Sequence, residues 1–212
     1  MGFFITFEGI DGAGKSTQAR MLAGRLRSAV PVVLTREPGG APGAEAIRTL
    51  LVEGEPGRWS PETELLLFNA ARRDHVERVI RPALEAGQVV LCDRYVDSTR
   101  AYQGGSGLRD RADRVHDLMI GLDPDLTLIF DVDPGTGAAR AGARGGAEDR
   151  FERKGLAFQE ALRREFRAIA EAEPRRCALI DADGSQEAVA ERVWSIVRER
   201  LPQDVLPERG HG

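Results

Sequence analysis

The sequence is poor in cysteine and has no long hydrophobic run. Cys92 and Cys177 are its only cysteines; each lies in an apolar, strand-like run, and neither has the spacing of a metal ligand. We therefore expect two buried, reduced thiols. No apolar stretch approaches the roughly 18 residues that a membrane span needs. The start of the chain also lacks the features of a secretory signal, so we expect a cytoplasmic protein without a membrane partner.

Lysine is nearly absent. Lys15 and Lys154 are the only lysines among 30 basic residues, and the formal net charge is −4. This charge argues against bulk binding of nucleic acid to a basic surface, so we expect no nucleic-acid partner. Because an arginine-rich composition can reflect coding bias, only arginines that a motif places are interpreted as functional.

Histidine and asparagine are also rare. The three histidines, His75, His116 and His211, lie in helical patterns or in the tail, and no Ser/His/Asp arrangement is recognisable. The only asparagine, Asn69, is followed by alanine, so the Asn-Lys-x-Asp motif with which GTPases read guanine is missing. A nucleotide-dependent switch or binding module remains an alternative to an enzyme. The missing motif argues against a GTPase switch.

One complete motif is present near the start of the chain. The pattern GxxxxGK(S/T) lies between the apolar run Phe3 to Phe7 and a helical pattern at Thr17 to Arg27. In that context the loop turns backbone N–H groups toward phosphate oxygens, with the lysine on the β and γ phosphates and the serine on Mg²⁺. The residues predicted to bind the nucleotide are Gly9, Ile10, Asp11, Gly12, Ala13, Gly14, Lys15, Ser16 and Thr17. The alternative is a glycine-rich turn without a ligand.

Strand-like and helical patterns alternate along the rest of the chain. After Phe3 to Phe7, β-rich runs recur, each separated from the next by helical patterns; they lie at 32–35, 89–93, 126–132 and 177–181. This order predicts a five-stranded parallel sheet covered on both faces, the three-layer α/β/α sandwich of P-loop NTPases. A length of 212 residues suits one domain, 1–212.

Several boundaries can be predicted as well. Ser60, followed by Pro61, and Ser185 are expected to cap helices, and Pro82 is expected to kink or end one. The tail at 202–212 is expected to fray. Two glycine-rich loops, at 103–107 and 142–146, are candidates for mobile segments near a site.

A polar segment follows the run at 89–93. A carboxylate at the carboxyl end of a strand in such a sheet faces the ligand crevice. Asp93 could therefore help to position Mg²⁺ through water, and Arg94 could hold a phosphate. The alternative is that these two residues merely pair or cap a helix.

Beyond these patterns, the chain from Phe4 to about Leu201 resembles the thymidylate kinases, and more closely their bacterial branch. Six segments match in the right order: 7–17, 35–40, 68–72, 93–104, 124–128 and 149–152. The resemblance implies transfer of the γ-phosphoryl group of ATP to dTMP in dTTP synthesis, with Mg²⁺ as cofactor, by a homodimer. The alternative enzyme is a P-loop kinase for another pyrimidine monophosphate.

Phe68 and Arg72 are four residues apart and share one helix face. Spacing alone favours a core phenylalanine beside a surface arginine. In the family, however, the corresponding ring stacks on thymine and the arginine donates to a carbonyl oxygen.

The resemblance also assigns other residues to dTMP. Tyr102 matches a tyrosine that lies against the sugar and disfavours a ribose 2′-hydroxyl, and Asp11 matches a carboxylate that accepts from the 3′-hydroxyl. Glu37 lies in a loop that holds the acceptor phosphate region, and whether it acts on metal, on sugar or on structure stays open. Further candidates for contact with base or phosphate are Ser98, Thr99 and Gln103.

One branch of the family has an arginine in the phosphate loop where this chain has Gly12. In the bacterial branch the missing charge comes from a mobile lid, expected at about 140–152. We expect Arg144 to supply it, then Arg150, with Arg140 as a further candidate. The separation of Arg144 and Arg150 is about one residue longer than the family pattern.

The implied reaction needs no general base. A phosphate monoester has a second pKa near 6 and is largely dianionic at neutral pH. The difficulty is bringing one polyanion onto another, which calls for positioning and positive charge. Lys15, Arg94, Mg²⁺ and the lid arginines are expected to supply both.

Overall fold

The structure, a computed structural model, describes residues 2–55, 57–104, 107–142 and 155–202. The predictions for Arg144 and Arg150, and most of the lid expected at about 140–152, lie outside the described residues. So does nearly all of the tail at 202–212.

Within the described chain, five parallel strands form one sheet in the order β2-β3-β1-β4-β5. The strands are β1 (Phe3–Gly9), β2 (Val32–Arg36), β3 (Val89–Asp93), β4 (Leu126–Asp131) and β5 (Cys177–Asp181). Every residue of β1 is buried, and in β3 and β4 only the last residue is not. Central strands of a parallel sheet lose both solvent faces because helices cover them, which is why these strands are continuous apolar runs.

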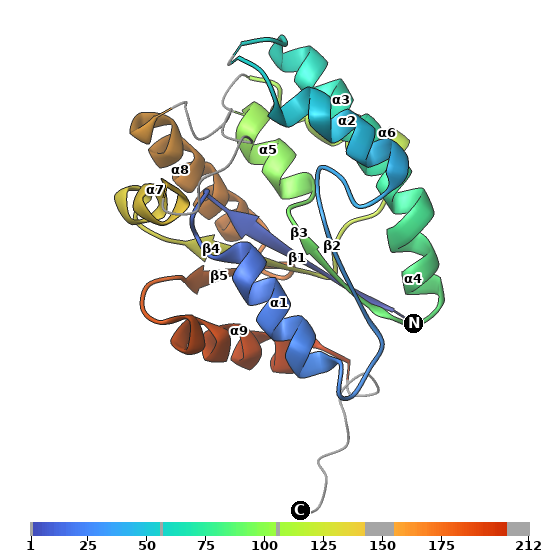
Figure 1. The fold of residues 1–212 in the computed structure, drawn as a ribbon, viewed down its shortest axis with the longest axis vertical. Coiled ribbons are helices and arrows are strands. Elements are labelled where there is room, and N and C mark those ends of the chain that lie inside the picture. Colours follow the sequence, from blue (N-terminus) through green and yellow to red (C-terminus); the bar gives the residue numbers. More distant parts are fainter. Residues whose placement is uncertain (1, 56, 105–106, 143–154, 203–212) are drawn as a thin grey trace, which may run out of the picture.

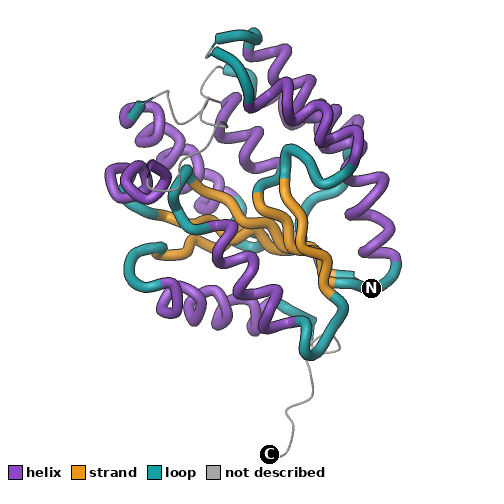
Figure 2. The backbone as a smooth tube through the Cα atoms, in the orientation of Figure 1, coloured by secondary structure: helices purple, strands orange, loops and turns teal. Residues whose placement is uncertain are grey.

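Helices cover both faces of the sheet (Figures 1 and 2). On one face pack α1 (Lys15–Leu26) and α9 (Gln186–Arg200), and on the other α4 (Arg81–Glu85), α5 (Val96–Gly104) and α8 (Leu156–Ala172). Around them lie the remaining helices: α2 (Pro42–Val52) against α3 (Pro61–His75), α6 (Arg109–Met119) against α3 and α5, and α7 (Pro134–Gly142) against α8. The predicted three-layer α/β/α sandwich is confirmed.

The predicted helix caps are confirmed. The side chain of Ser60 accepts from the N–H of Thr63 at 3.2 Å, and that of Ser185 accepts from the N–H of Ala188 at 3.2 Å. Each serine satisfies a backbone donor that the first helical turn leaves unpaired.

Pro82 does not end the helix that follows Ser60, because the helical segment continues to Glu85. Before the proline, η1 (Val76–Ile80) is a π-helix, and the N–H of Arg81 donates to the oxygen of Val76, five residues back. A proline within a regular α-helix removes one hydrogen bond and crowds the carbonyl four residues earlier. The change from α to π winding accommodates it.

Both cysteines are buried and free, as predicted. In the part of the chain that the structure describes, no helix is both long enough and apolar enough to cross a bilayer.

Candidate active site

The phosphate-binding loop connects the carboxyl end of β1 to α1, the context predicted from the motif. Gly12 has a φ of 75°, a conformation that strains other residues. It also has no space for a side chain, because a Cβ would lie 1.9 Å from the backbone oxygen of Gly137 in α7. An arginine at position 12 is therefore incompatible with this arrangement of loop and helix.

Lys15 is the first residue of α1. It is 6% exposed, and its Nζ donates to the backbone oxygen of Ile10 at 2.7 Å. Burial, and after it the nearby charge of Arg94, lowers the pKa of Lys15 to about 8. The ammonium group therefore lies where a further negative charge, such as a phosphate, would be stabilising.

Arg94 follows β3 with a φ of 70°, which is uncommon outside glycine. From there its Nη1 donates to the oxygen of Gly9 at 3.1 Å and to Oγ of Ser98 at 3.0 Å, and its Nη2 donates to Oδ1 of Asp11 at 2.5 Å. Burial acts to raise the pKa of Asp11, but Arg94 and Lys15 outweigh it and hold that pKa below its ordinary value. Among the described residues, the ion pair of Arg94 is with Asp11 and not with Asp93.

A cavity of about 260 Å³ lies beside the loop. Every residue predicted to bind the substrate lines it: Asp11, Glu37, Phe68, Arg72, Arg94, Ser98, Thr99, Tyr102 and Gln103. Other predicted residues on its wall are Gly12, Gly14, Lys15, Ser16 and Asp93. Those that do not line it are Gly9, Ile10, Ala13 and Thr17.

Arg72 reaches the cavity from α3 and is 2% exposed. Its Nε donates to Oε2 of Glu37 at 2.8 Å, and its Nη2 donates to the oxygen of Tyr95 at 3.0 Å and to Oγ1 of Thr99 at 2.9 Å. Its Nη1 is buried without a hydrogen-bond partner among the described residues. The interpretation from spacing alone, a surface arginine, is therefore wrong, and Glu37 contacts the arginine directly.

Tyr102 lies on α5 between the loop and the cavity. Its hydroxyl donates to Oδ2 of Asp11 at 3.4 Å, and its ring centroid is 5.3 Å from Cζ of Arg94. Burial raises the pKa of Tyr102, so the side chain is a neutral phenol. The two residues predicted to face the sugar, Tyr102 and Asp11, are thus in contact.

Ser16 and Asp93 form the predicted metal position. The hydroxyl of Ser16 donates to Oδ2 of Asp93, and both residues line the cavity. Oxygen ligands of this kind suit Mg²⁺, which takes one or two protein ligands and completes its shell with phosphate oxygens and water. Among the described residues there is no group of three or more His, Cys, Asp or Glu side chains that could hold a metal ion.

Glu8, the residue before Gly9, was not predicted to act at the site. It is buried in β1 and accepts from the N–H of Tyr95 at 2.7 Å, the N–H of Ser98 at 3.2 Å and the hydroxyl of Ser98 at 2.5 Å. Burial, and after it Asp97, raises the pKa of Glu8 to about 7. Because Oγ of Ser98 also accepts from Arg94, Glu8 helps to hold that arginine in place through Ser98. A carboxylate inside an apolar run was the available signal.

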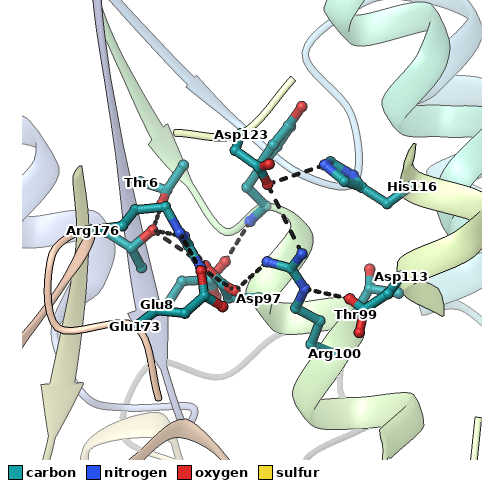
Figure 3. Close-up of polar contacts among 12 residues, drawn as sticks. Thr6, Glu8, Asp97, Thr99, Arg100, Asp113, His116, Asp123, Glu173 and Arg176 are labelled. Atoms are coloured by element: carbon teal, nitrogen blue, oxygen red, sulfur yellow. Dashed lines mark hydrogen bonds and ion pairs between the residues drawn. The ribbon is translucent and has the colours of Figure 1, made fainter. Parts of the chain in front are cut away.

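Asp97 is a second buried carboxylate that holds α5, and Figure 3 shows it between Arg176 and Arg100. It accepts from Arg176 at 2.6 and 3.0 Å and from Arg100 at 3.0 Å. Arg100 continues to Asp113 of α6 at 2.7 Å. Burial acts to raise the pKa of Asp97, but Arg176 and Arg100 outweigh it and lower that pKa. The helix that carries Thr99 and the other cavity residues is therefore held to its neighbours by ion pairs.

Arg140, the one described lid candidate, does not line the cavity. Its Nη1 donates to the backbone oxygen of Ala182 at 3.2 Å. Conversely, the cavity wall includes residues that were not predicted: Arg36, Pro38, Arg48, Val52 and Tyr95. Arg36 and Pro38 flank Glu37, and Tyr95 follows Arg94, so their position next to predicted residues was the available sequence signal for them. Arg48 and Val52 lie in α2, which carries no motif.

Comparisons with known proteins agree with this geometry. A family model described as thymidylate kinase matches residues 7–193. The thymidylate kinase of Ruegeria pomeroyi is 57% identical over 203 residues, covering 94% of this chain and 96% of that protein. That of Caulobacter vibrioides is 57% identical over 204 residues, covering 94% and 98%. A crystal structure of thymidylate kinase from Ehrlichia chaffeensis superposes with a TM-score of 0.77 at 36% identity, covering 92% of this chain and 98% of that one.

Proposed function

Because the chain belongs to the thymidylate kinase family and so transfers the γ-phosphoryl group of ATP to dTMP in dTTP synthesis, we propose that its cavity binds dTMP with the thymine between Phe68 and Arg72. The observation that carries this proposal is the buried Nη1 of Arg72, which has no partner among the described residues.

An unpaired buried donor is unfavourable by about 1–3 kcal/mol, and O4 of thymine would accept from it. Cytosine carries an amino group at that position, so two donors would face each other. Oε1 of Gln103, which is also buried without a partner among the described residues, offers an acceptor for the N3–H of thymine. Phe68 supplies a ring on which the base can stack. These contacts favour thymine or uracil over cytosine.

At the other end of the cavity, Asp11 and Tyr102 would contact the deoxyribose. The Asp11 carboxylate is available to accept from the 3′-hydroxyl, since its pKa lies below the ordinary value. Tyr102 would occupy the space of a 2′-hydroxyl. Ser98 and Thr99 lie on the same helix as Tyr102 and also line the cavity, so either could contact the base or the phosphate.

Phosphoryl transfer would then depend on charge and position. Lys15 would hold the β and γ phosphates, and Arg94 would bridge donor and acceptor phosphates. We propose that Ser16 ligates Mg²⁺ directly and that Asp93 does so through water; when bound, the ion neutralises charge on the β and γ oxygens. No general base is needed, because the acceptor phosphate is already dianionic.

The remaining positive charge is assigned to the lid at about 140–152. Gly12 cannot be replaced by an arginine against α7, which supports a source outside the loop. We propose Arg144 first and Arg150 second. Arg140 would first have to release the carbonyl of Ala182.

We further propose that the chain works as one kinase domain, in the cytoplasm and as a homodimer. Three exposed apolar side chains on the neighbouring helices α3 and α6 support the dimer. These are Leu66, Leu118 and Met119, which are 61%, 82% and 55% exposed.

The experiment that tests the proposed base contacts measures ADP release from Mg·ATP with dTMP, dUMP, dCMP, UMP, CMP, GMP and AMP offered separately. We expect a strong preference for dTMP, with dUMP next, and little release without an acceptor. Preference for a cytosine or purine nucleotide would contradict the assignment of Arg72.

A further inference from the structure

A chain of four polar side chains runs from the sheet to the cavity; three of them, His75, Glu37 and Arg72, are buried, and Thr35 is partly exposed. Oγ1 of Thr35, in β2, lies 2.7 Å from Nε2 of His75, the last residue of α3. Nδ1 of His75 lies 3.1 Å from Oε1 of Glu37, and Oε2 of Glu37 accepts from Nε of Arg72 at 2.8 Å. His75 is completely buried, and Glu37 is 6% exposed. The reaction uses neither the histidine nor the threonine.

With an ionised Glu37 and a neutral imidazole, each link has one donor and one acceptor. A carboxylate can only accept, so Nδ1 of His75 carries the proton that it donates to Glu37. In the neutral ring, Nε2 then accepts from the hydroxyl of Thr35. The two carboxylate oxygens of Glu37 are thereby engaged from two directions, one by His75 and one by Arg72. The carboxylate cannot rotate without breaking one of these bonds.

The loop after β2 closes over the same side chains. A Cβ at Gly40 would lie 2.5 Å from Nε2 of His75 and 2.6 Å from Oγ1 of Thr35. The loop is held there because the N–H of Gly40 donates to Oε1 of Glu45 at 2.8 Å and Arg48 donates to the oxygen of Pro38 at 2.6 Å. The His75–Thr35 contact is direct at 2.7 Å, and the backbone at Gly40 packs against both side chains.

We propose that Thr35 and His75 are positioning residues for base selection, acting through Glu37 to fix the guanidinium of Arg72. The proposal deepens the proposed function and rests on the role given there to Arg72. An arginine side chain has many rotamers, and the bonds of Nε to Glu37 and of Nη2 to Tyr95 and Thr99 hold the one in which Nη1 would face the base. If the carboxylate turns, Nη1 no longer faces the position of O4. The selectivity for a base with a carbonyl group over a base with an amino group at that position then falls.

The test compares selectivity rather than activity alone. Thr35→Val removes the hydroxyl at nearly constant shape, and His75→Asn keeps a donor toward Glu37 but loses the link to Thr35. For each variant, kcat and KM are measured with dTMP, dUMP and dCMP, and KM is measured with ATP. We expect the ratio of kcat/KM for dTMP to that for dCMP to fall on the order of tenfold, the size of effect expected when a buried hydrogen bond is lost. We also expect KM for dTMP to rise and KM for ATP to stay within about twofold. Thr35→Ser, which retains the hydroxyl, should keep the parent ratio of kcat/KM for dTMP to that for dCMP.

Thr6→Val is the matched control. Thr6 is likewise a strand threonine, more deeply buried than Thr35, and its hydroxyl is 2.8 Å from that of Thr127, away from the cavity wall. This variant should lose at least as much stability, read as Tm, and keep the parent ratio. The positioning role is overturned if folded Thr35→Val and His75→Asn keep the parent ratio while Arg72→Lys lowers it. If Arg72→Lys leaves the ratio of kcat/KM for dTMP to that for dCMP unchanged, the contact between Arg72 and the base is overturned, and the positioning role of Thr35 and His75 with it.

Discussion

Lys15 shows how a buried side chain can oppose stability and still serve binding. Its pKa of about 8 in the folded protein lies below the ordinary value of 10.5. The folded state therefore holds this proton less tightly than the unfolded state, and this group makes the free protein less stable as the pH falls from 10.5 through 8. A bound polyphosphate reverses the imbalance, because it stabilises the ammonium form.

Binding of ATP should consequently take up protons. At pH 8 about half of the free protein carries a neutral Lys15, so we expect an uptake of about half a proton per ATP, falling toward zero at pH 6.5. Above pH 8 the KM for ATP should rise. Calorimetry in buffers of different ionisation enthalpy measures the uptake, and Lys15→Met is the control that should remove it. An uptake that is the same at pH 6.5 and pH 8 would contradict the assignment to Lys15.

Among single residues, those inside motifs were predictable and those that support them were not. Asp11, Phe68, Arg72 and Tyr102 were assigned from the sequence because the matched segments include them, and the structure brings them to one cavity. Arg48 comes from a helix without a motif. Its approach to the cavity depends on how α2 packs against α3, which no local pattern encodes.

At the scale of an element, α5 depends on the buried ion pairs of Asp97. Asp97→Asn keeps the shape but leaves Arg176 and Arg100 without their shared counter-charge. We expect the free energy of unfolding to fall by about 3 kcal/mol, as when one partner of a buried pair is removed. Urea denaturation measures it. The control is Glu77→Gln, which breaks the exposed pair with Arg73 and should change stability by less than about 0.5 kcal/mol. Equal effects of the two substitutions would contradict the role of Asp97.

The proposed lid, at about 140–152, is the segment from which we expect the remaining positive charge of the transfer step. We expect Arg144→Ala to lower kcat on the order of a thousandfold, and Arg150→Ala to do so if it shares the role, by analogy with other arginines that serve phosphoryl transfer. Single-turnover kinetics with saturating ATP and dTMP separate this effect from binding. Variants that both keep kcat within a few-fold of the parent would exclude the lid arginines.

Element boundaries were predictable where one residue decides them. Ser60 and Ser185 cap their helices because a side-chain oxygen satisfies a specific backbone donor. Pro82 does not end its helix, and the alternative, a kink, stays a prediction, since the local effect of the proline depends on the winding of the five residues before it. The π winding of η1, which joins α3 to α4 in one continuous helical segment, is a feature that the proline alone does not reveal.

At the scale of the whole molecule, the proposed homodimer can be tested on the apolar surface formed by Leu66, Leu118 and Met119. We expect the parent protein to be a dimer at micromolar concentration and Leu66→Glu/Leu118→Glu to be a monomer, because a buried unpaired charge opposes association. Size-exclusion chromatography with light scattering measures both. Leu179→Glu, at an exposed position of β5, should stay dimeric; a monomeric parent would contradict the proposal.

The parallel sheet follows from the alternation of strand and helix patterns, and with it the edge of the sheet where the site forms. The order of the strands was not predicted. Because β1 and β3 are neighbours in the structure, their carboxyl ends lie side by side, and the phosphate loop meets Arg94 there. The Thr35–His75–Glu37–Arg72 chain was not predictable in the same way. It joins the carboxyl-terminal part of α3 to β2 and to the loop after β2, through side chains whose partners appear only after folding.

The close approach of Gly12 to Gly137 also limits how this chain can evolve. The two positions are far apart in the sequence, yet any side chain at the first collides with the backbone at the second. Acquiring a loop arginine would therefore require a coordinated shift of α7. A single substitution at Gly12 without that shift would be deleterious. Homologues that carry a side chain at this loop position should thus show compensating changes around the start of α7, a covariation that arises from backbone geometry rather than from side-chain pairing.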